Sequence, residues 1–358
     1  MKIYQAMQLN AAGSKNLIKN TESPGEKRKW ILVYLAKIFL TVAFCFAFVT
    51  VWTLFLGSEN SIAGVVILLN LLTFRQADFG IKCSHGTGVL FFSFMLLAAG
   101  PRLANSLPPI PAFFINSLCI FALLFFGCHN IIMCNHFTFV LSYLLLLGYD
   151  VTGRSFTIRA LGLLTGGLFC SVIFYIKHRK IQYKRTLFDL FHEFNLHSSR
   201  TQWQIKLALA APLVMMTAEL LKIPKPMWFG ICTMSLLHPF REDLVYRAKR
   251  RAPFNIVGGL VFLALYTCLP SSMLPFIGLI GGIGVGFSAS YSWQTIFNTF
   301  GALSMAAGIF GAVGAIILRV ASNAAATVYC FLFEKGFHTF FHRILSLLPD
   351  KTSDCEVL

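Results

Sequence analysis

Charge is scarce in this chain of 358 residues: only 12% of them are Asp, Glu, Lys or Arg, and just 14 are acidic. An average soluble domain has about 25% charged residues. A soluble fold of this size needs polar side chains over its whole surface, and this sequence has too few of them. The composition therefore excludes a cytosolic enzyme, a disordered protein and a secreted disulfide scaffold.

Paired cysteine motifs are missing too, because none of the 10 cysteines forms a C-x-x-C pair. Most of them lie inside apolar runs, as Cys119 does, where a free thiol behaves as a small hydrophobic group. Cys128, His129, Cys134 and His136 form a cluster with ligand chemistry, for which we expect a polar turn between two helices and no metal. No Ser-His-Asp or paired-carboxylate pattern indicates an enzyme, and we expect no cofactor.

Apolar residues are abundant, at 56% of the chain with 37 phenylalanines, and the mean hydropathy is +0.70. Runs of this kind, long enough for a hydrocarbon core of about 30 Å, predict an all-α bundle of transmembrane helices. We expect about twelve spans, within a range of ten to twelve. The predicted spans are 30–57, 62–74, 86–99, 111–126, 131–147, 156–176, 205–221, 227–238, 254–269, 273–290, 294–310 and 311–333.

The segments between these runs define the predicted domains. A polar N-terminal arm (1–29) precedes a first transmembrane repeat (30–176), and a basic linker (177–204) leads to a second repeat (205–333) and an amphipathic tail (334–358). The net charge of +16 gathers in alternate loops, as expected when positive segments stay in the cytoplasm. The sequence thus predicts cytoplasmic N- and C-termini and membrane lipids as partners, with no nucleic acid.

An internal repeat supports this division. When Arg75 is aligned with Arg241, Phe74 falls on Phe240 and Gly64 on Gly230. In addition, Arg159 precedes the pair Gly166-Gly167 at the same spacing as Arg251 precedes Gly258-Gly259. With six spans each, the two halves would be parallel repeats about an axis along the membrane normal.

A family resemblance rests on the second half. Its residues are Trp228 and Thr233 on one helix, the turn His238-Pro239-Phe240-Arg241, and then Arg247, Arg251 and Gly258. They resemble the signature of the fusaric acid resistance protein-like (FUSC, aromatic acid exporter) family. Phe254 and Asn255 depart from it, because the family usually has Gly and Thr at these positions.

The resemblance implies a protein of the bacterial inner membrane that exports small organic anions, often aromatic carboxylic acids, with the help of the proton gradient. Some relatives work with a periplasmic adaptor. Plant malate channels with a similar membrane core conduct anions passively as homodimers. The open alternatives are therefore a passive dimeric anion channel and a membrane protein that assists envelope assembly without transport.

Candidate site residues follow from the need for positive groups beside an anion pathway. The candidates for substrate binding are Arg75, Arg241, Arg247, Arg251, Trp228 and Arg159, and those for proton coupling are Glu219 and Asp150. Arg75 and Arg241 form the best pair, although anchoring of the topology explains them equally well. Asp150 also suits an ion pair with Arg154 or Arg159. Arg319, with Asn323 one turn later, should face the bundle interior or extend to a membrane edge.

Overall fold

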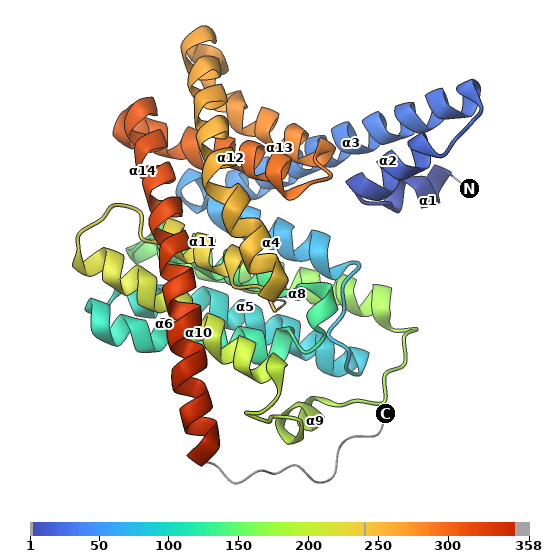
Figure 1. Cartoon of the computed structure of the whole chain (residues 1–358). Helices are drawn as coiled ribbons and strands as arrows, with labels where there is room; N and C mark the ends of the chain where they lie inside the picture. The colour runs from blue at the N-terminus through green and yellow to red at the C-terminus, as the bar shows by residue number, and fades with distance from the viewer. Residues whose placement is uncertain (1–2, 240, 348–358) are drawn as a thin grey trace. The chain divides into compact units, whose positions relative to one another are not determined.

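The computed structural model describes residues 3–239 and 241–347, and the regular structure of these residues is helical, without strands. The α-helices are α1 (Ile3–Gln8), α2 (Ala11–Lys19), α3 (Pro24–Leu56), α4 (Ser61–Phe74), α5 (Cys83–Asn105), α6 (Pro109–Gly127), α7 (His136–Gly148), α8 (Gly153–His178), α9 (Leu187–His192), α10 (Ser199–Leu220), α11 (Met227–Leu236), α12 (Arg241–Cys268), α13 (Ile277–Phe287) and α14 (Tyr291–Leu347) (Figure 1). Short 3-10 helices occupy Ser58–Asn60 (η1), Ile131–Met133 (η2) and Ser271–Phe276 (η3). The predicted all-α class is confirmed.

Six helices among the described residues are long and apolar enough to cross a membrane: α3, α5, α6, α8, Asp243–Cys268 of α12 and Tyr291–Phe341 of α14. Shorter apolar segments accompany them at Ser58–Phe74, His136–Gly148, Met227–Leu236 and Ser271–Phe287. A helix needs about 20 residues to span the hydrocarbon core. The chain is therefore a multi-pass membrane protein, while the count of about twelve spans in two repeats stays a prediction.

Helix α14 changes direction at Gly311, where φ is 70° and ψ is 165°. These angles lie outside the helical region and are accessible almost only to glycine. The break lies where the predicted spans 294–310 and 311–333 meet, while their separate crossing of the membrane stays a prediction. Beyond the break, α14 continues to Leu347 and passes residue 334, where we expected a separate tail to begin.

The other predicted boundaries also differ by a few residues from the observed helix ends. Helix α3 begins at Pro24, inside the predicted arm, because proline is well suited to the first helical turn. Helix α8 extends to His178, and α10 begins at Ser199. The basic linker is correspondingly shorter than predicted, and it contains the short helix α9.

Contacts divide the chain into two compact units. The first unit contains the residues up to Leu68 together with Glu242–Ala324, and the second contains Leu69–Arg241 together with the residues from Ala325 onward. These groupings differ from the two predicted repeats, which stay a prediction. Each unit is described by itself below.

The second unit is built around α5, which packs against α6, α7 and α8, while α10 packs against α6 and α11. These helices lie side by side in Figure 1. Fully buried aromatic rings fill the centre, and the ring of Phe74 lies 5.0 Å from Phe79 and 4.8 Å from Phe139. At Gly167 an added Cβ would come within 2.6 Å of the Phe94 Cβ, so this glycine allows α8 to approach α5 closely.

The loops of the second unit gather at its two ends as the predicted alternation of spans requires. At one end, the Lys82 N–H donates to Arg185 O at 2.8 Å, and the Tyr183 hydroxyl donates to Asp78 Oδ2 at 2.8 Å. Asn135 Nδ2 reaches Asp78 O at 3.0 Å. The loop after α4, the turn between α6 and α7, and the basic linker therefore lie together. We predict this end to be cytoplasmic.

The opposite end joins the loop after α5 to the loop after α7. Arg102 Nη1 lies 2.6 Å from Asp150 Oδ2, and Asn105 Nδ2 donates to Leu147 O at 2.9 Å. Both loops were predicted to lie on the same, outer side. The sorting of the loops into two ends thus agrees with the alternation, while the identity of the cytoplasmic end stays a prediction.

The first unit packs α13 against α3 and packs α12 against both parts of α14. The Tyr34 hydroxyl of α3 donates to Gly286 O at 3.3 Å. A Cβ at Gly258 would come within 2.8 Å of Ile296 O, and one at Gly259 within 2.8 Å of an Ile316 methyl group. These two glycines therefore allow close packing of α12 against α14. At Gly301, by contrast, an added Cβ would meet nothing within 4 Å.

Candidate functional site

Three arginine side chains are buried among the described residues of this membrane body. Arg159 of α8 is 4% exposed, and Arg251 of α12 and Arg319 of α14 are each 7% exposed. A charge inside a membrane bundle is costly unless it is hydrogen-bonded, and such residues are frequently functional. Their partners therefore decide what each arginine can do.

Arg251 lies in a network of polar side chains in the first unit. Its Nε donates to Asn323 Oδ1 at 2.7 Å, and its Nη1 donates to the Tyr291 hydroxyl at 2.9 Å. One turn along α12, Asn255 Nδ2 donates to Arg251 O at 2.7 Å, and Thr299 Oγ1 donates to Asn255 Oδ1 at 3.0 Å. We call Arg251, Asn255, Tyr291, Thr299 and Asn323 the Arg251 network.

Helical spacing places these residues together. Arg251, Asn255, Gly258 and Gly259 are all buried and recur at the spacing of one α12 face. The glycines bring that face against α14. Asn255 takes part through its amide. The Asn323 amide also donates to Arg319 O at 2.7 Å, so a second buried arginine lies one turn from the network.

Arg247, another predicted substrate-binding residue, lies beside the network. Its guanidinium carbon is 5.1 Å from the centre of the Tyr291 ring, a cation–π distance. Arg247 and Arg251 therefore contact the same tyrosine, one at its ring and the other at its hydroxyl. The arrangement gives two adjacent cations of α12 a common aromatic partner.

The other predicted arginines have different surroundings. Arg159, in the second unit, donates from Nη1 to the backbone carbonyl of Tyr149. Arg75 follows the end of α4 and is exposed. The side chain of Arg241 lies outside the described residues, so the expected pairing of Arg75 with Arg241 stays a prediction. Trp228 of α11 is 1% exposed and belongs to the core of the second unit.

Glu219, one of the two predicted coupling acids, is exposed and lines a cavity of about 350 Å³ in the second unit. Lys225 and Asn116 line the same cavity. Asp150 instead forms a partly exposed ion pair with Arg102. The expected partners of Asp150 were Arg154 and Arg159, and the structure identifies Arg102 of α5 because the loops after α5 and α7 meet at this end.

Comparison with known proteins bears on the same region. Residues 213–333 match the family described as fusaric acid resistance protein-like. The match confirms the resemblance seen in the sequence over about the last third of the chain. No curated protein and no solved structure matches the chain.

The segment that matches the fusaric acid resistance protein-like family contains the whole Arg251 network, together with Arg319, Trp228 and Glu219. Arg75, Arg159 and Asp150 lie outside it. Buried polar groups and the family match thus coincide on α12 and α14.

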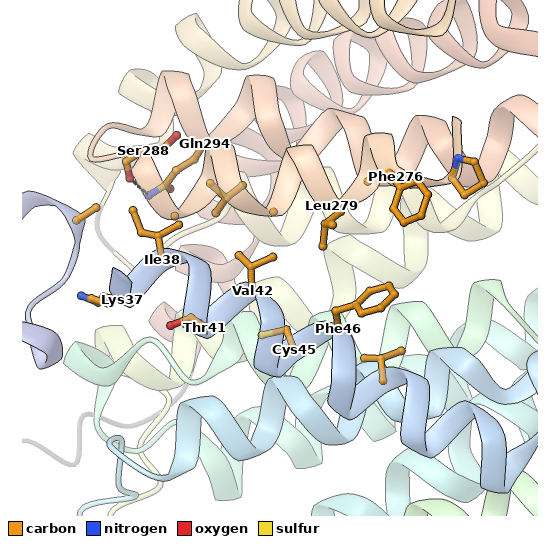
Figure 2. A pocket seen from close by; sticks show the side chains of 17 residues that line it. Lys37, Ile38, Thr41, Val42, Cys45, Phe46, Phe276, Leu279, Ser288 and Gln294 are labelled. Carbon is orange, nitrogen blue, oxygen red and sulfur yellow. Dashed lines mark hydrogen bonds between the residues drawn. The ribbon is translucent and has the colours of Figure 1, made fainter. Parts of the chain in front are cut away.

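A large cavity of the first unit, of about 920 Å³, lies between α3 and α13. Figure 2 shows Lys37, Thr41, Ser288 and Gln294 toward one end of it, and Phe46 and Phe276 toward the other. The Gln294 amide donates to Ser288 O at 3.3 Å. The cavity has an apolar body, and the Lys37 amine at its polar end donates to the Leu9 carbonyl.

Sequence reasoning missed several polar partners. Tyr291 and Thr299 gave no signal, because a tyrosine or threonine in an apolar span has many structural uses. Of the two alternatives predicted for Arg319, the bundle interior and a membrane edge, the structure shows the first, because this side chain is buried. The Cys128–His136 cluster is a turn containing η2, as predicted. The described residues contain no group of three or more His, Cys, Asp or Glu side chains able to hold a metal.

Proposed function

We propose that this protein is an inner-membrane transporter that exports small organic anions, including aromatic carboxylic acids, from the cytoplasm. The observation that carries the proposal is the Arg251 network, in which a buried guanidinium is bonded to the Asn323 amide and the Tyr291 hydroxyl within the segment that matches the fusaric acid resistance protein-like family. The proposal assigns no enzymatic reaction to the chain.

The chemistry of the network supports an anion. A guanidinium presents five N–H donors in a planar fork that matches a carboxylate, and it stays charged at all physiological pH values. Here the Asn323 amide and the Tyr291 hydroxyl accept two of these donors. A carboxylate is a stronger acceptor than either, because charge-assisted hydrogen bonds are about twice as strong as neutral ones. An entering acid can therefore exchange with these neutral partners.

Similar helix packing in the two units supports a duplicated transport body. In the second unit, α5 contacts α7 and α8. In the first unit, α12 meets α14 through Gly258 before the break at Gly311 and through Gly259 after it. If the two parts of α14 correspond to α7 and α8, each repeat has six helices in the same order. Alternating access between such repeats is a common transport mechanism.

Proton coupling is assigned to Glu219. Its position on the wall of a cavity that also contains Lys225 gives a titratable acid beside the predicted outer end of the second unit. A carboxyl that exchanges protons with the outer side could link substrate release to proton entry.

The test uses the purified full chain in liposomes loaded with radiolabelled benzoate. Efflux driven by an imposed pH gradient supports the exporter, while gradient-independent current would indicate a passive anion channel. Absence of both in correctly inserted protein would support the envelope-assembly alternative. Glu219→Gln should remove the dependence on the gradient and leave benzoate binding intact.

Arg251→Gln is the critical variant, with Arg154→Gln as its control. Both remove one arginine charge, but Arg154 is exposed on α8, while Arg251 is buried in the network. We expect Arg251→Gln to lower flux strongly and Arg154→Gln to leave it unchanged. Equal flux from both variants would contradict the assignment of Arg251.

A further inference from the structure

A basic cavity at the predicted cytoplasmic end of the second unit has no part in the proposed transport path. It has a volume of about 630 Å³ and lies between the α6–α7 turn and the basic linker. Lys184, Arg185 and Arg200 supply three cations to its wall. None of the residues that line it is acidic.

Glu193 of the linker holds two of these cations from one side. Its carboxylate lies 3.1 Å from Arg185 Nε and 3.5 Å from Arg200 Nη2. Lys184 is exposed and finds no ion-pair partner among the described residues. One carboxylate therefore faces three cations, and the cavity keeps a positive charge.

His129 forms the inner wall of the cavity, with its side chain 5% exposed. Its Nε2 lies 3.2 Å from both Arg185 Nη1 and Arg200 Nη1. Burial and the charge of Arg200 lower the pKa of His129 from 6.5 to about 4, although Glu193 acts in the opposite direction. At neutral pH the imidazole is uncharged, and its Nε2 also lies 3.1 Å from Glu193 Oε2, so His129, Glu193 and the two arginines form one cluster behind the cavity.

The rim of the cavity is apolar on one side. Ile131 and Ile132 of η2 line it, and Ile132 is 81% exposed. A site for a soluble anion has no use for an exposed isoleucine beside its cations. At the boundary between lipid headgroups and acyl chains, an exposed isoleucine beside cations is useful, because one end of the ligand is charged and the other is apolar.

We propose that this cavity binds the phosphate headgroup of an anionic phospholipid, with Lys184, Arg185 and Arg200 around the phosphate and Ile132 beside the lipid chains. The bound lipid would join the α6–α7 turn to the linker that connects the predicted repeats. The site is independent of what the protein transports.

The experiment measures lipid binding to the intact detergent-purified chain by native mass spectrometry during titration with phosphatidylglycerol. Lys184→Gln is the main variant, because Lys184 is exposed and the substitution should not affect folding. Lys180→Gln is the matched control, since Lys180 is an exposed lysine of the same linker that does not line the cavity. A basic residue near a lipid surface contributes enough binding energy for Lys184→Gln to bind about fivefold more weakly.

Competition with other ligands shows whether the bound phosphate belongs to a lipid or is a free anion. The proposal expects millimolar inorganic phosphate to displace little lipid and zwitterionic phosphatidylcholine to bind weakly at this site. Displacement by inorganic phosphate at low concentration would instead identify a free-anion site and overturn the proposal. Equal phosphatidylglycerol binding by Lys184→Gln and Lys180→Gln would overturn it as well. Arg200→Gln should have a larger effect than Lys184→Gln, because Arg200 also contacts His129 and Glu193.

Discussion

Arg159 and Arg251 occupy similar places in the sequence, each ahead of a glycine pair, yet the two units use them differently. Arg159 of α8 is bonded to a backbone carbonyl, that of Tyr149, which directly follows α7. Arg251 is bonded to the side chains of Tyr291 and Asn323, which lie on α14 before and after its break at Gly311. A carbonyl in a folded backbone cannot rotate away, whereas an amide or a phenol can. The same residue type thus holds a loop in one unit and offers exchangeable contacts in the other.

The largest expected effect separates these two roles. Arg251→Gln should weaken transport of an aromatic acid by about tenfold to a hundredfold, because hydrogen bonds to a charged group contribute about 1.5–3 kcal/mol. Arg159→Gln should instead lower the thermal unfolding midpoint and leave the flux per folded molecule unchanged. Flux assays in liposomes, normalised to folded protein by size-exclusion chromatography, measure transport by both variants, and thermal unfolding in detergent measures the midpoint. A loss of flux in Arg159→Gln without a loss of stability would erase the distinction.

Glycine packing gives the next contrast. Gly258→Ala would force its Cβ to 2.8 Å from a backbone oxygen, that of Ile296, which cannot move without α14. We expect a loss of about 1–3 kcal/mol in stability, typical of overpacking. Gly301→Ala is the control, with nothing within 4 Å of its Cβ. Thermal unfolding of the two variants in the same detergent compares them, and similar midpoints would mean that α12 and α14 are further apart than described.

The stability of the second unit should depend on pH, because its His129 is buried beside two arginines. The pKa of His129 is about 4 in the folded chain, below its ordinary 6.5. Between these values the unfolded chain binds a proton that the folded chain does not, so stability is complete above pH 6.5 and falls as the pH drops toward 4. From pH 7.5 to pH 5 the loss should be about 2 kcal/mol.

His129→Gln tests this dependence, because glutamine fills the site and does not titrate in this range. Thermal unfolding of the two proteins between pH 7.5 and pH 5 should show a steeper decline for the natural chain. Parallel curves would mean that His129 does not contribute.

The smallest effect concerns Asp150. Its ion pair with Arg102 is partly exposed, with side-chain exposures of 28% and 32%. Pairs of this kind contribute about 0–1 kcal/mol. Asp150→Asn should therefore change the unfolding midpoint little and leave the gradient dependence of transport intact, unlike Glu219→Gln. A loss of gradient dependence in Asp150→Asn would move the coupling role to this loop.

The sequence predicted what depends on local pattern. Apolar runs of sufficient length predicted the helices, the length of the last run predicted its division near residue 311, and the spacing of Arg319 and Asn323 indicated a polar face. The sorting of the second unit's loops into two ends agrees with the alternation of the predicted spans, whose orientation stays a prediction. These properties need only the residues of one segment.

Partners that come from distant segments could not be predicted in this way. Arg251 finds Tyr291 and Asn323 on other helices, and His129 finds Arg200 far along the chain. Nothing in the spacing within one helix determines which residue of another helix lies opposite. Asp150 shows the same limit, since its nearest arginines in sequence are not the one to which it pairs.

The torsion angles at Gly311 restrict evolution more severely than any contact of that residue. An added Cβ there would touch no neighbouring atom within 4 Å, so there is room for a side chain. The obstacle is its own backbone, since φ of 70° with ψ of 165° lies in a region that residues with a Cβ avoid. Glycine is therefore the residue compatible with this bend, and a substitution at Gly311 should straighten α14 although there is space for the new side chain.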